Sequence, residues 1–230
     1  MKIHVNGIDI HYEAEGEGPP IILLHGNGED HTIFDYLAED LGTRFTVYSI
    51  DTRGHGESER VDSFHYSDMT EDVAAFITEL GLKRPVLYGF SDGGIVGLML
   101  AAKYPGMLSG LIASGANLTP KDMKWTSRAS MRLTNAVRKD PLTELMIREP
   151  NITDEDLLSI DVPVLITVGE RDIIPVSHAE HIADTIPGGN LIVLPKENHY
   201  SYIVHSYKIS PIISWFIDGI ISADAAEDDL

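Results

Sequence analysis

The chain contains no cysteine, few basic residues and no long hydrophobic run. The absence of cysteine excludes disulfide bonds, thiolate catalysis and cysteine-ligated metal sites. Lysine and arginine number 17 against 36 aspartates and glutamates, so the formal net charge is −19. This charge disfavours binding to nucleic acids or anionic membranes, because such binding depends on a positive surface. We therefore expect a small-molecule substrate, with no nucleic-acid partner and no membrane partner.

The apolar segments and the composition bear on location and assembly. None of the apolar runs approaches the roughly 18 residues that a membrane-spanning helix requires. The first residues form an alternating strand pattern in place of a signal peptide. With 230 residues, of which 43% are hydrophobic and 23% charged, the chain has the composition of one large globular domain. The sequence thus predicts a cytoplasmic protein that is a monomer or a homodimer.

Predicted strands alternate with predicted helices along most of the chain. Asn6-Gly7 separates the first two strands and is a dipeptide typical of a tight hairpin turn. Several later strands are continuous apolar runs, as expected for strands buried on both faces. The alternation predicts an α/β fold with a mostly parallel, eight-stranded sheet and helices on both faces. The predicted strands span residues 2–6, 8–14, 19–26, 45–50, 84–90, 108–114, 162–169 and 190–195. The predicted helices span residues 32–42, 67–82, 93–105, 177–187 and 209–221.

Two segments depart from this alternation. Residues 117–160 show no strand pattern, and their apolar side chains predict short amphipathic helices that form a small lid across the edge of the sheet. Residues 222–230 are acidic and poor in large apolar groups, so we expect a frayed tail. The predicted core therefore comprises residues 1–116 and 161–221.

Ser91 lies between a predicted strand and a predicted helix, within the sequence GFSDGG. In a Gly-x-Ser-x-Gly turn the serine adopts a strained backbone conformation, and its hydroxyl is presented at the C-terminal edge of the sheet. Gly89 and Gly93 supply the small residues that let the helix pack close to the strand. The pattern favours Ser91 as a catalytic nucleophile, although small residues alone also occur in ordinary strand–helix turns.

A nucleophilic serine needs a base and an acid that orients the base. Asp172 and His199 each follow a predicted parallel strand, so they are expected at the same edge as Ser91. Their order along the chain, nucleophile then acid then base, is the one typical of this architecture. Glu170 and His205 are the alternatives for the acid and the base. Asn117 follows the remaining strand, but an amide cannot serve as the anionic partner.

The oxyanion hole is expected to use two backbone N–H groups. One belongs to Asp92, directly after the nucleophile, and the other to Asn27, in the loop after an early strand. We interpret His25 as a structural residue that maintains the shape of this loop. The pair His178 and His181 lacks a third candidate ligand, so we expect no metal site and no cofactor.

The segments LLHGNG, DTRGHGES, GFSDGG, GERDIIP and NHYSY span residues 23–202, and together they resemble the α/β-hydrolase superfamily. The segments GFSDGGIVGLMLAAKYP and SGAN further resemble the valacyclovir-hydrolase-like branch, whose members are serine esterases of amino-acid esters. The resemblance implies that the Asp92 carboxylate helps to hold a substrate ammonium group. A purely local role for Asp92 in turn hydrogen bonds is the alternative. Related enzymes commonly have a longer cap, so the short lid predicts a shallower, more open cleft.

The sequence thus predicts a cofactor-independent serine esterase with the catalytic residues Ser91, Asp172 and His199. Asp92 and Trp125 are the candidate substrate-binding residues. Amino-acid esters, lactones and carbon–carbon bonds are alternative targets for hydrolysis. A small-molecule sensor that binds a ligand without turnover is an alternative on the same fold.

Overall fold

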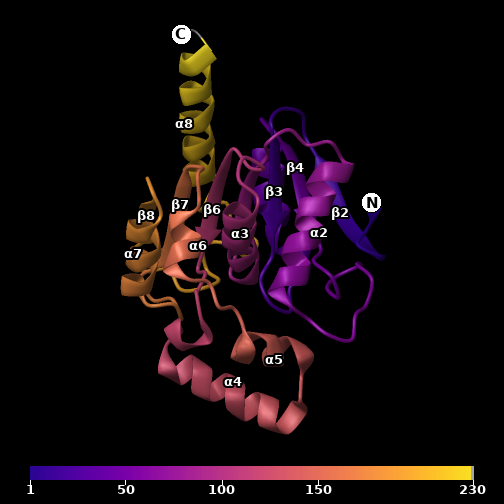
Figure 1. Ribbon diagram of the computed structural model, residues 1–230, viewed down its shortest axis with the longest axis vertical. Coiled ribbons are helices and arrows are strands. Elements are labelled where there is room, and N and C mark those ends of the chain that lie inside the picture. The colour runs from indigo at the N-terminus through magenta and orange to yellow at the C-terminus, as the bar shows by residue number, and fades with distance from the viewer. Residues whose placement is uncertain (229–230) are drawn as a thin grey trace.

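The computed structural model describes residues 1–228, which form one eight-stranded sheet with helices on both faces (Figure 1). The strand order is β1-β2-β4-β3-β5-β6-β7-β8. β1 and β2 pair antiparallel, as do β2 and β4, and all the other neighbours pair parallel. The predicted α/β class and mostly parallel sheet are confirmed. The strands are β1 (Lys2–Val5), β2 (Ile8–Glu15), β3 (Pro20–Leu24), β4 (Thr46–Ile50), β5 (Val86–Phe90), β6 (Gly110–Ser114), β7 (Val164–Gly169) and β8 (Asn190–Leu194).

Alternate residues of each central strand pack on opposite faces of the sheet. In β3, for example, Ile22 and Leu24 belong to one hydrophobic core and Ile21 and Leu23 to the other. α2, α3 and α7 cover the first core, whereas η1, α1 and α8 cover the second. This period of two explains why the central strands are apolar throughout. The covering helices are η1 (His31–Phe34), α1 (Asp35–Leu41), α2 (Tyr66–Glu79), α3 (Asp92–Lys103), α7 (Val176–Thr185) and α8 (Ser210–Asp228).

The segment between β6 and β7 forms helices only, as the sequence predicts. Leu145 is buried, whereas Leu133 and Val137 are exposed. Figure 1 shows α4 and α5 below the sheet, beyond the ends of the strands. We call this segment the cap. Its helices are η2 (Pro120–Asp122), α4 (Trp125–Arg138), α5 (Pro141–Arg148) and α6 (Asp154–Leu158).

The expectation of a frayed tail over residues 222–230 is wrong for most of that segment. α8 begins at Ser210 and continues to Asp228, while residues 229–230 lie outside the described part of the chain. The segment is rich in alanine, the residue with the highest helix propensity, so it extends the helix that precedes it. Among residues 1–228, neither α8 nor any other helix is long and apolar enough to cross a membrane.

α3 approaches the sheet so closely that a side chain at Gly93 has no room. A Cβ atom at this position would lie 2.1 Å from the carbonyl oxygen of Leu24. We expect Gly93→Ala to lower the free energy of unfolding by about 2–3 kcal/mol, because backbone must move to relieve the overlap. Urea denaturation measures the change. Gly219 in α8 is the matched control, since a Cβ there meets no atom within 4 Å. Gly219→Ala should stabilise the protein by about 0.5–1 kcal/mol, and equal effects of the two substitutions would contradict this account.

Candidate functional site

Ser91 occupies a strained turn between β5 and α3. Its backbone angles are φ 52° and ψ −112°, a conformation that costs a non-glycine residue on the order of 1–3 kcal/mol. The two flanking glycines make the turn possible. A Cβ atom at Gly89 would lie 2.2 Å from the carbonyl oxygen of Gly93, so neither the strand nor the helix can carry a side chain at the crossing. The structure therefore presents Ser91 as the sequence predicts.

His199 and Asp172 lie next to Ser91, although they follow different strands. His199 Nε2 is 3.1 Å from Ser91 Oγ, and His199 Nδ1 is 2.6 Å from Asp172 Oδ1. The backbone N–H of Ile174 also donates to Asp172 Oδ1, at 3.0 Å, and that of Gly169 donates to Oδ2 at 3.3 Å. These contacts orient a fully buried carboxylate toward the imidazole.

The contact with Asp172 determines the protonation pattern of the imidazole. Because a carboxylate only accepts hydrogen bonds, Nδ1 carries the proton and Nε2 accepts the bond from the Ser91 hydroxyl. The aromatic rings of Phe90 and Tyr200 pack against His199, with centroid separations of 4.9 and 5.0 Å. The ring is thereby held in place and shielded from water.

The alternative acid and base lie elsewhere. Glu170 accepts a hydrogen bond from the backbone N–H of Lys196, and its side chain is exposed. His205 packs against Tyr36, on the η1–α1 side of the molecule, and its own backbone N–H donates to the carbonyl of Ile33. Neither residue contacts the hydrogen-bonded path from Ser91 to Asp172.

The backbone N–H groups of Asn27 and Asp92 have no hydrogen-bond acceptor among residues 1–228. They lie on the two segments that flank Ser91, the loop after β3 and the start of α3. Gly93 N–H donates to the carbonyl of His25 at 3.1 Å and holds these two segments together. Two free donors beside a serine hydroxyl are the arrangement that a developing oxyanion requires.

The loop that carries Asn27 is shaped by side-chain acceptors. His25 is buried, and its Nε2 accepts the backbone N–H of Thr52 at 3.0 Å, as expected for a structural residue. Burial, followed by the neighbouring His55, lowers the pKa of His25 to about 4, so the ring is neutral at pH 7. Glu29 accepts the backbone N–H of Gly26 at 3.0 Å and closes the turn.

The Asp92 side chain is buried and directed at the same cavity as Ser91. Its Oδ2 accepts from Asn27 Nδ2 at 2.9 Å, and its Oδ1 accepts from the Tyr66 hydroxyl at 2.8 Å. Burial raises the pKa of Asp92, and the two hydrogen bonds partly oppose this rise. No sequence pattern indicated Tyr66, which reaches Asp92 from the first turn of α2.

A cavity of about 450 Å³ lies between Ser91 and the cap, a size suited to a small ligand. Apolar side chains and hydroxyl groups line it together. Its lining consists of Tyr66, Ser91, Asp92, Asn117, Met123, Thr126, Ser127, Ser130, Met131, Met146, Glu149, Ile173, Ile174 and Tyr200.

The structure does not bring Trp125, the other candidate substrate-binding residue, to the cavity. Its side chain is 72% exposed and does not line the cavity. α4 turns about 100° per residue, so the lining residues Thr126, Ser127, Ser130 and Met131 share one face and Trp125 lies on the other. The sequence predicted short amphipathic helices within residues 117–160, but not which helix face turns toward Ser91.

Glu29 is a second residue of the site that the sequence analysis missed. A Cβ atom at Gly26 would touch the side chains of both Glu29 and Ser91, so these two side chains lie close together. Burial raises the pKa of Glu29 to about 7, against an opposing effect of its hydrogen bond from Gly26 and of nearby His199. A carboxyl group that titrates near neutrality is thus part of the loop that carries Asn27.

Side chains spaced as metal ligands lie away from Ser91. Among residues 1–228 they form two overlapping groups around His31, one with His11 and Glu13 and the other with Asp30 and Asp51. The rings of the pair His178 and His181 are 6.4 Å apart, and this pair belongs to neither group.

Comparison with known proteins identifies a matching family model and related proteins. The family model described as alpha/beta hydrolase fold matches residues 19–135. Serine hydrolase BPHL of Homo sapiens is 31% identical over 250 residues, which cover 94% of this chain and 85% of the relative.

Two solved structures share the fold at lower sequence identity. The enol-lactonase from Burkholderia xenovorans LB400 superposes with a TM-score of 0.79 at 20% identity, covering 95% of this chain and 100% of that one. A thermophilic esterase from Thermogutta terrifontis, solved with malate bound, gives a TM-score of 0.78 at 24% identity, covering 96% of this chain and 98% of the other.

The raised pKa of Glu29 predicts a specific dependence of stability on pH. Between its ordinary pKa of 4.5 and about 7, the folded protein retains a proton that the unfolded chain has released. The contribution of Glu29 is therefore fully present below pH 4.5 and is lost as the pH rises through 7. Glu29→Gln should match the wild type at pH 4 and exceed its unfolding free energy by about 1–2 kcal/mol at pH 8, allowing for partial exposure. Urea titrations at both pH values test this. Exposed Glu17→Gln serves as the control, and a Glu29→Gln effect that does not change with pH would refute the prediction.

Proposed function

Because the chain belongs to the α/β-hydrolase family, in the branch of serine hydrolase BPHL, we propose that it cleaves small carboxylic esters through an acyl-enzyme intermediate. The observation that carries this proposal is the continuous hydrogen-bonded path from Ser91 Oγ through His199 to Asp172. A serine hydroxyl is a weak nucleophile, and this path supplies the base that it lacks.

In the first half of the reaction, His199 Nε2 takes the hydroxyl proton as Ser91 Oγ bonds to the ester carbonyl carbon. Asp172 stabilises the imidazolium that results, through the 2.6 Å contact at Nδ1. The N–H groups of Asn27 and Asp92 donate to the oxyanion of the tetrahedral intermediate. Loss of one such donor typically costs about 3–4 kcal/mol of barrier.

The intermediate then expels the alcohol, which takes its proton from the His199 imidazolium, and the acyl group remains on Ser91. In the second half, His199 Nε2 removes a proton from water as the water oxygen attacks the acyl carbon. Collapse of this second intermediate releases the carboxylic acid and returns the proton to Ser91 Oγ. Protons and electron pairs balance within the three side chains and the water, so the cycle requires no cofactor.

The Asp92 carboxylate favours a second candidate substrate, an amino-acid ester. The carboxylate lies in the wall of the same cavity as the Ser91 hydroxyl, where a substrate ammonium can reach it. Burial leaves it short of hydration, and an ammonium can compensate for that loss. A lactone is a third variant, since a cyclic ester reacts by the same steps, and the enol-lactonase shares the fold.

We expect p-nitrophenyl acetate and butyrate to be hydrolysed by the wild type, with Ser91→Ala reducing kcat by a factor of about 10⁴–10⁶. Asp172→Asn should reduce kcat by about 10⁴, because an amide no longer imposes the required imidazole tautomer. The rate of p-nitrophenol release measures the activity of the wild type and of both variants. Ser127→Ala, which changes another serine of the same cavity, should remain within a few-fold of the wild type.

Three outcomes would contradict this proposal in different ways. Activity retained in Ser91→Ala would exclude Ser91 as the nucleophile. Activity of His199→Ala within a few-fold of the wild type would exclude His199 as the base. Tight ligand binding without turnover of any ester or thioester would identify a sensor in place of an enzyme.

The amino-acid ester candidate makes a separate prediction. The wild type should hydrolyse the p-nitrophenyl ester of valine at least tenfold faster, in kcat/KM, than the 3-methylbutanoyl ester that lacks the amino group. Asp92→Asn should abolish this preference and leave the second rate nearly unchanged, because the backbone N–H of residue 92 is retained. Glu149→Gln is the matched control, since it neutralises another carboxylate of the cavity lining. A preference that survives in Asp92→Asn and disappears in Glu149→Gln would show that Glu149, and not Asp92, binds the ammonium group.

A further inference from the structure

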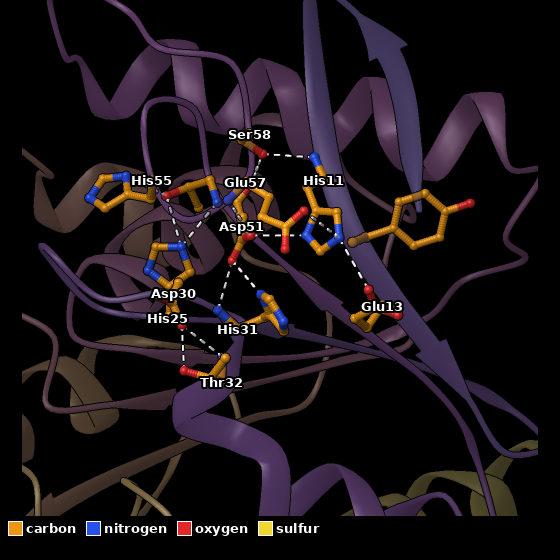
Figure 2. Close-up of polar contacts among 12 residues, drawn as sticks. His11, Glu13, His25, Asp30, His31, Thr32, Asp51, His55, Glu57 and Ser58 are labelled. Atoms are coloured by element: carbon orange, nitrogen blue, oxygen red, sulfur yellow. Dashed lines mark hydrogen bonds and ion pairs between the residues drawn. The ribbon is translucent and has the colours of Figure 1, made fainter.

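A second polar cluster surrounds Asp51, which directly follows β4 and is fully buried (Figure 2). Its two carboxylate oxygens each contact a different imidazole. Oδ2 lies 2.9 Å from His11 Nδ1, and Oδ1 lies 2.9 Å from His31 Nδ1. Antiparallel pairing of β2 with β4 brings His11 to this position, and η1 brings His31. Figure 2 shows Asp51 between the two histidines, with Glu13 beside His11.

Asp51 orients both rings in the same way. A buried carboxylate accepts hydrogen bonds, so each imidazole donates from Nδ1 and leaves Nε2 with a lone pair. A carboxylate on one ring nitrogen, with the other nitrogen free, is the arrangement that supports histidine as a metal ligand in proteins. The backbone N–H groups of His31 and Glu57 also donate to Asp51, at 2.7 and 2.9 Å, and fix the carboxylate.

The free nitrogen of His11 faces carboxylates. Nε2 lies 3.1 Å from Glu13 Oε1 and 3.9 Å from Glu57 Oε2. A lone pair and a carboxylate oxygen are both acceptors, so this contact is repulsive unless a positive charge lies between them. Either a second proton on the ring or a metal cation can supply that charge. His11 is 5% exposed, which makes an unbalanced contact there costly.

We propose that His11, Glu13 and His31 bind one Zn²⁺ ion. Each residue offers one ligand atom, and these atoms lie within 4.8 Å of one another. Ligand atoms of tetrahedral zinc are separated by roughly 3.3–3.5 Å, so the cluster needs only a small inward movement. Glu13 is 54% exposed and free to make that movement, and it already lies at the right distance from His11. Two imidazoles and one carboxylate suit zinc better than magnesium or calcium, which prefer oxygen ligands alone.

The zinc site is separate from the proposed ester hydrolysis. None of its three ligands lines the cavity at Ser91. Glu57 Oε2 lies 3.9 Å from His11 Nε2 but is not within ligand distance of all three residues, so water can fill the fourth position. Glu13 Oε1 also lies 3.5 Å from the Met1 ammonium, so zinc must displace this ion pair.

The test is a zinc titration of protein that carries no polyhistidine tag and has been stripped of metal with a chelator. Competition with a chromophoric chelator should show one equivalent of Zn²⁺ bound, with a dissociation constant below about 1 µM. Glu13→Gln should weaken binding at least tenfold and retain the fold, because Glu13 is exposed, and His31→Gln should do the same or more. Co²⁺ should give the visible absorption of a tetrahedral nitrogen and oxygen site in the wild type, and this absorption should be lost in both variants.

The controls use other histidine–carboxylate pairs of the same chain. His4 contacts Asp9 at 2.8 Å and His181 contacts Asp154 at 2.9 Å, both on the surface. His4→Gln and His181→Gln should bind zinc as the wild type does, and so should Ser91→Ala. The proposal fails if the wild type binds no stoichiometric zinc. That result would mean that a second proton on the His11 ring, and not a metal cation, balances the contact with Glu13. It also fails if Glu13→Gln and His31→Gln bind zinc with unchanged affinity, or if the control variants lose it equally.

Discussion

The close approach of α3 to the ends of β3 and β5 is the constraint on which the site depends. Only glycine fits at the crossing, since a Cβ at Gly93 would overlap the carbonyl of Leu24. The same approach brings Gly93 N–H to the carbonyl of His25 and so joins the helix to the loop after β3. Ser91 is left with positive φ at the top of the turn, and the N–H groups of Asn27 and Asp92 belong to the two segments that this contact joins. A single packing distance thus determines the conformation of the proposed nucleophile and the proposed oxyanion donors.

The loop after β3 connects the two polar clusters at this edge of the sheet. Backbone N–H groups of the loop and of the turn that follows it donate to side chains: Gly26 to Glu29 within the loop, Gly28 to His55 and His31 to Asp51. Side-chain acceptors of this kind can hold a loop that contains two glycines and no regular structure. The position of Asn27 N–H therefore depends on residues well outside the cavity, including the carboxylate that orients the proposed zinc ligands.

The sequence was informative where function follows from topology. Asp172 and His199 could be predicted because parallel strands end at one edge, so residues that directly follow those strands meet there. The sequence was uninformative where the direction of a side chain decides whether the residue lines the cavity. Trp125 and Met131 both lie in α4, and only the packing of the cap turns Met131 toward the cavity. The cluster of His11, Glu13 and His31 was equally hidden, because it arises from the antiparallel pairing of β2 with β4 and from a helical turn elsewhere in the chain.

The carboxylates close to Ser91 bear on the choice between neutral and cationic substrates. Burial raises the pKa of both Asp92 and Glu29, and the nearby Asp92 carboxylate raises the pKa of Glu29 further. The imidazolium of His199, which forms during acylation in the proposed mechanism, lowers the pKa of both carboxyl groups. A substrate ammonium beside Asp92 would have the same effect, so it would favour the ionised carboxylates before the proton transfer begins. The ionised carboxylates then stabilise the imidazolium. Binding of a cationic substrate and activation of Ser91 would thus reinforce each other, whereas a neutral ester would bind without this coupling.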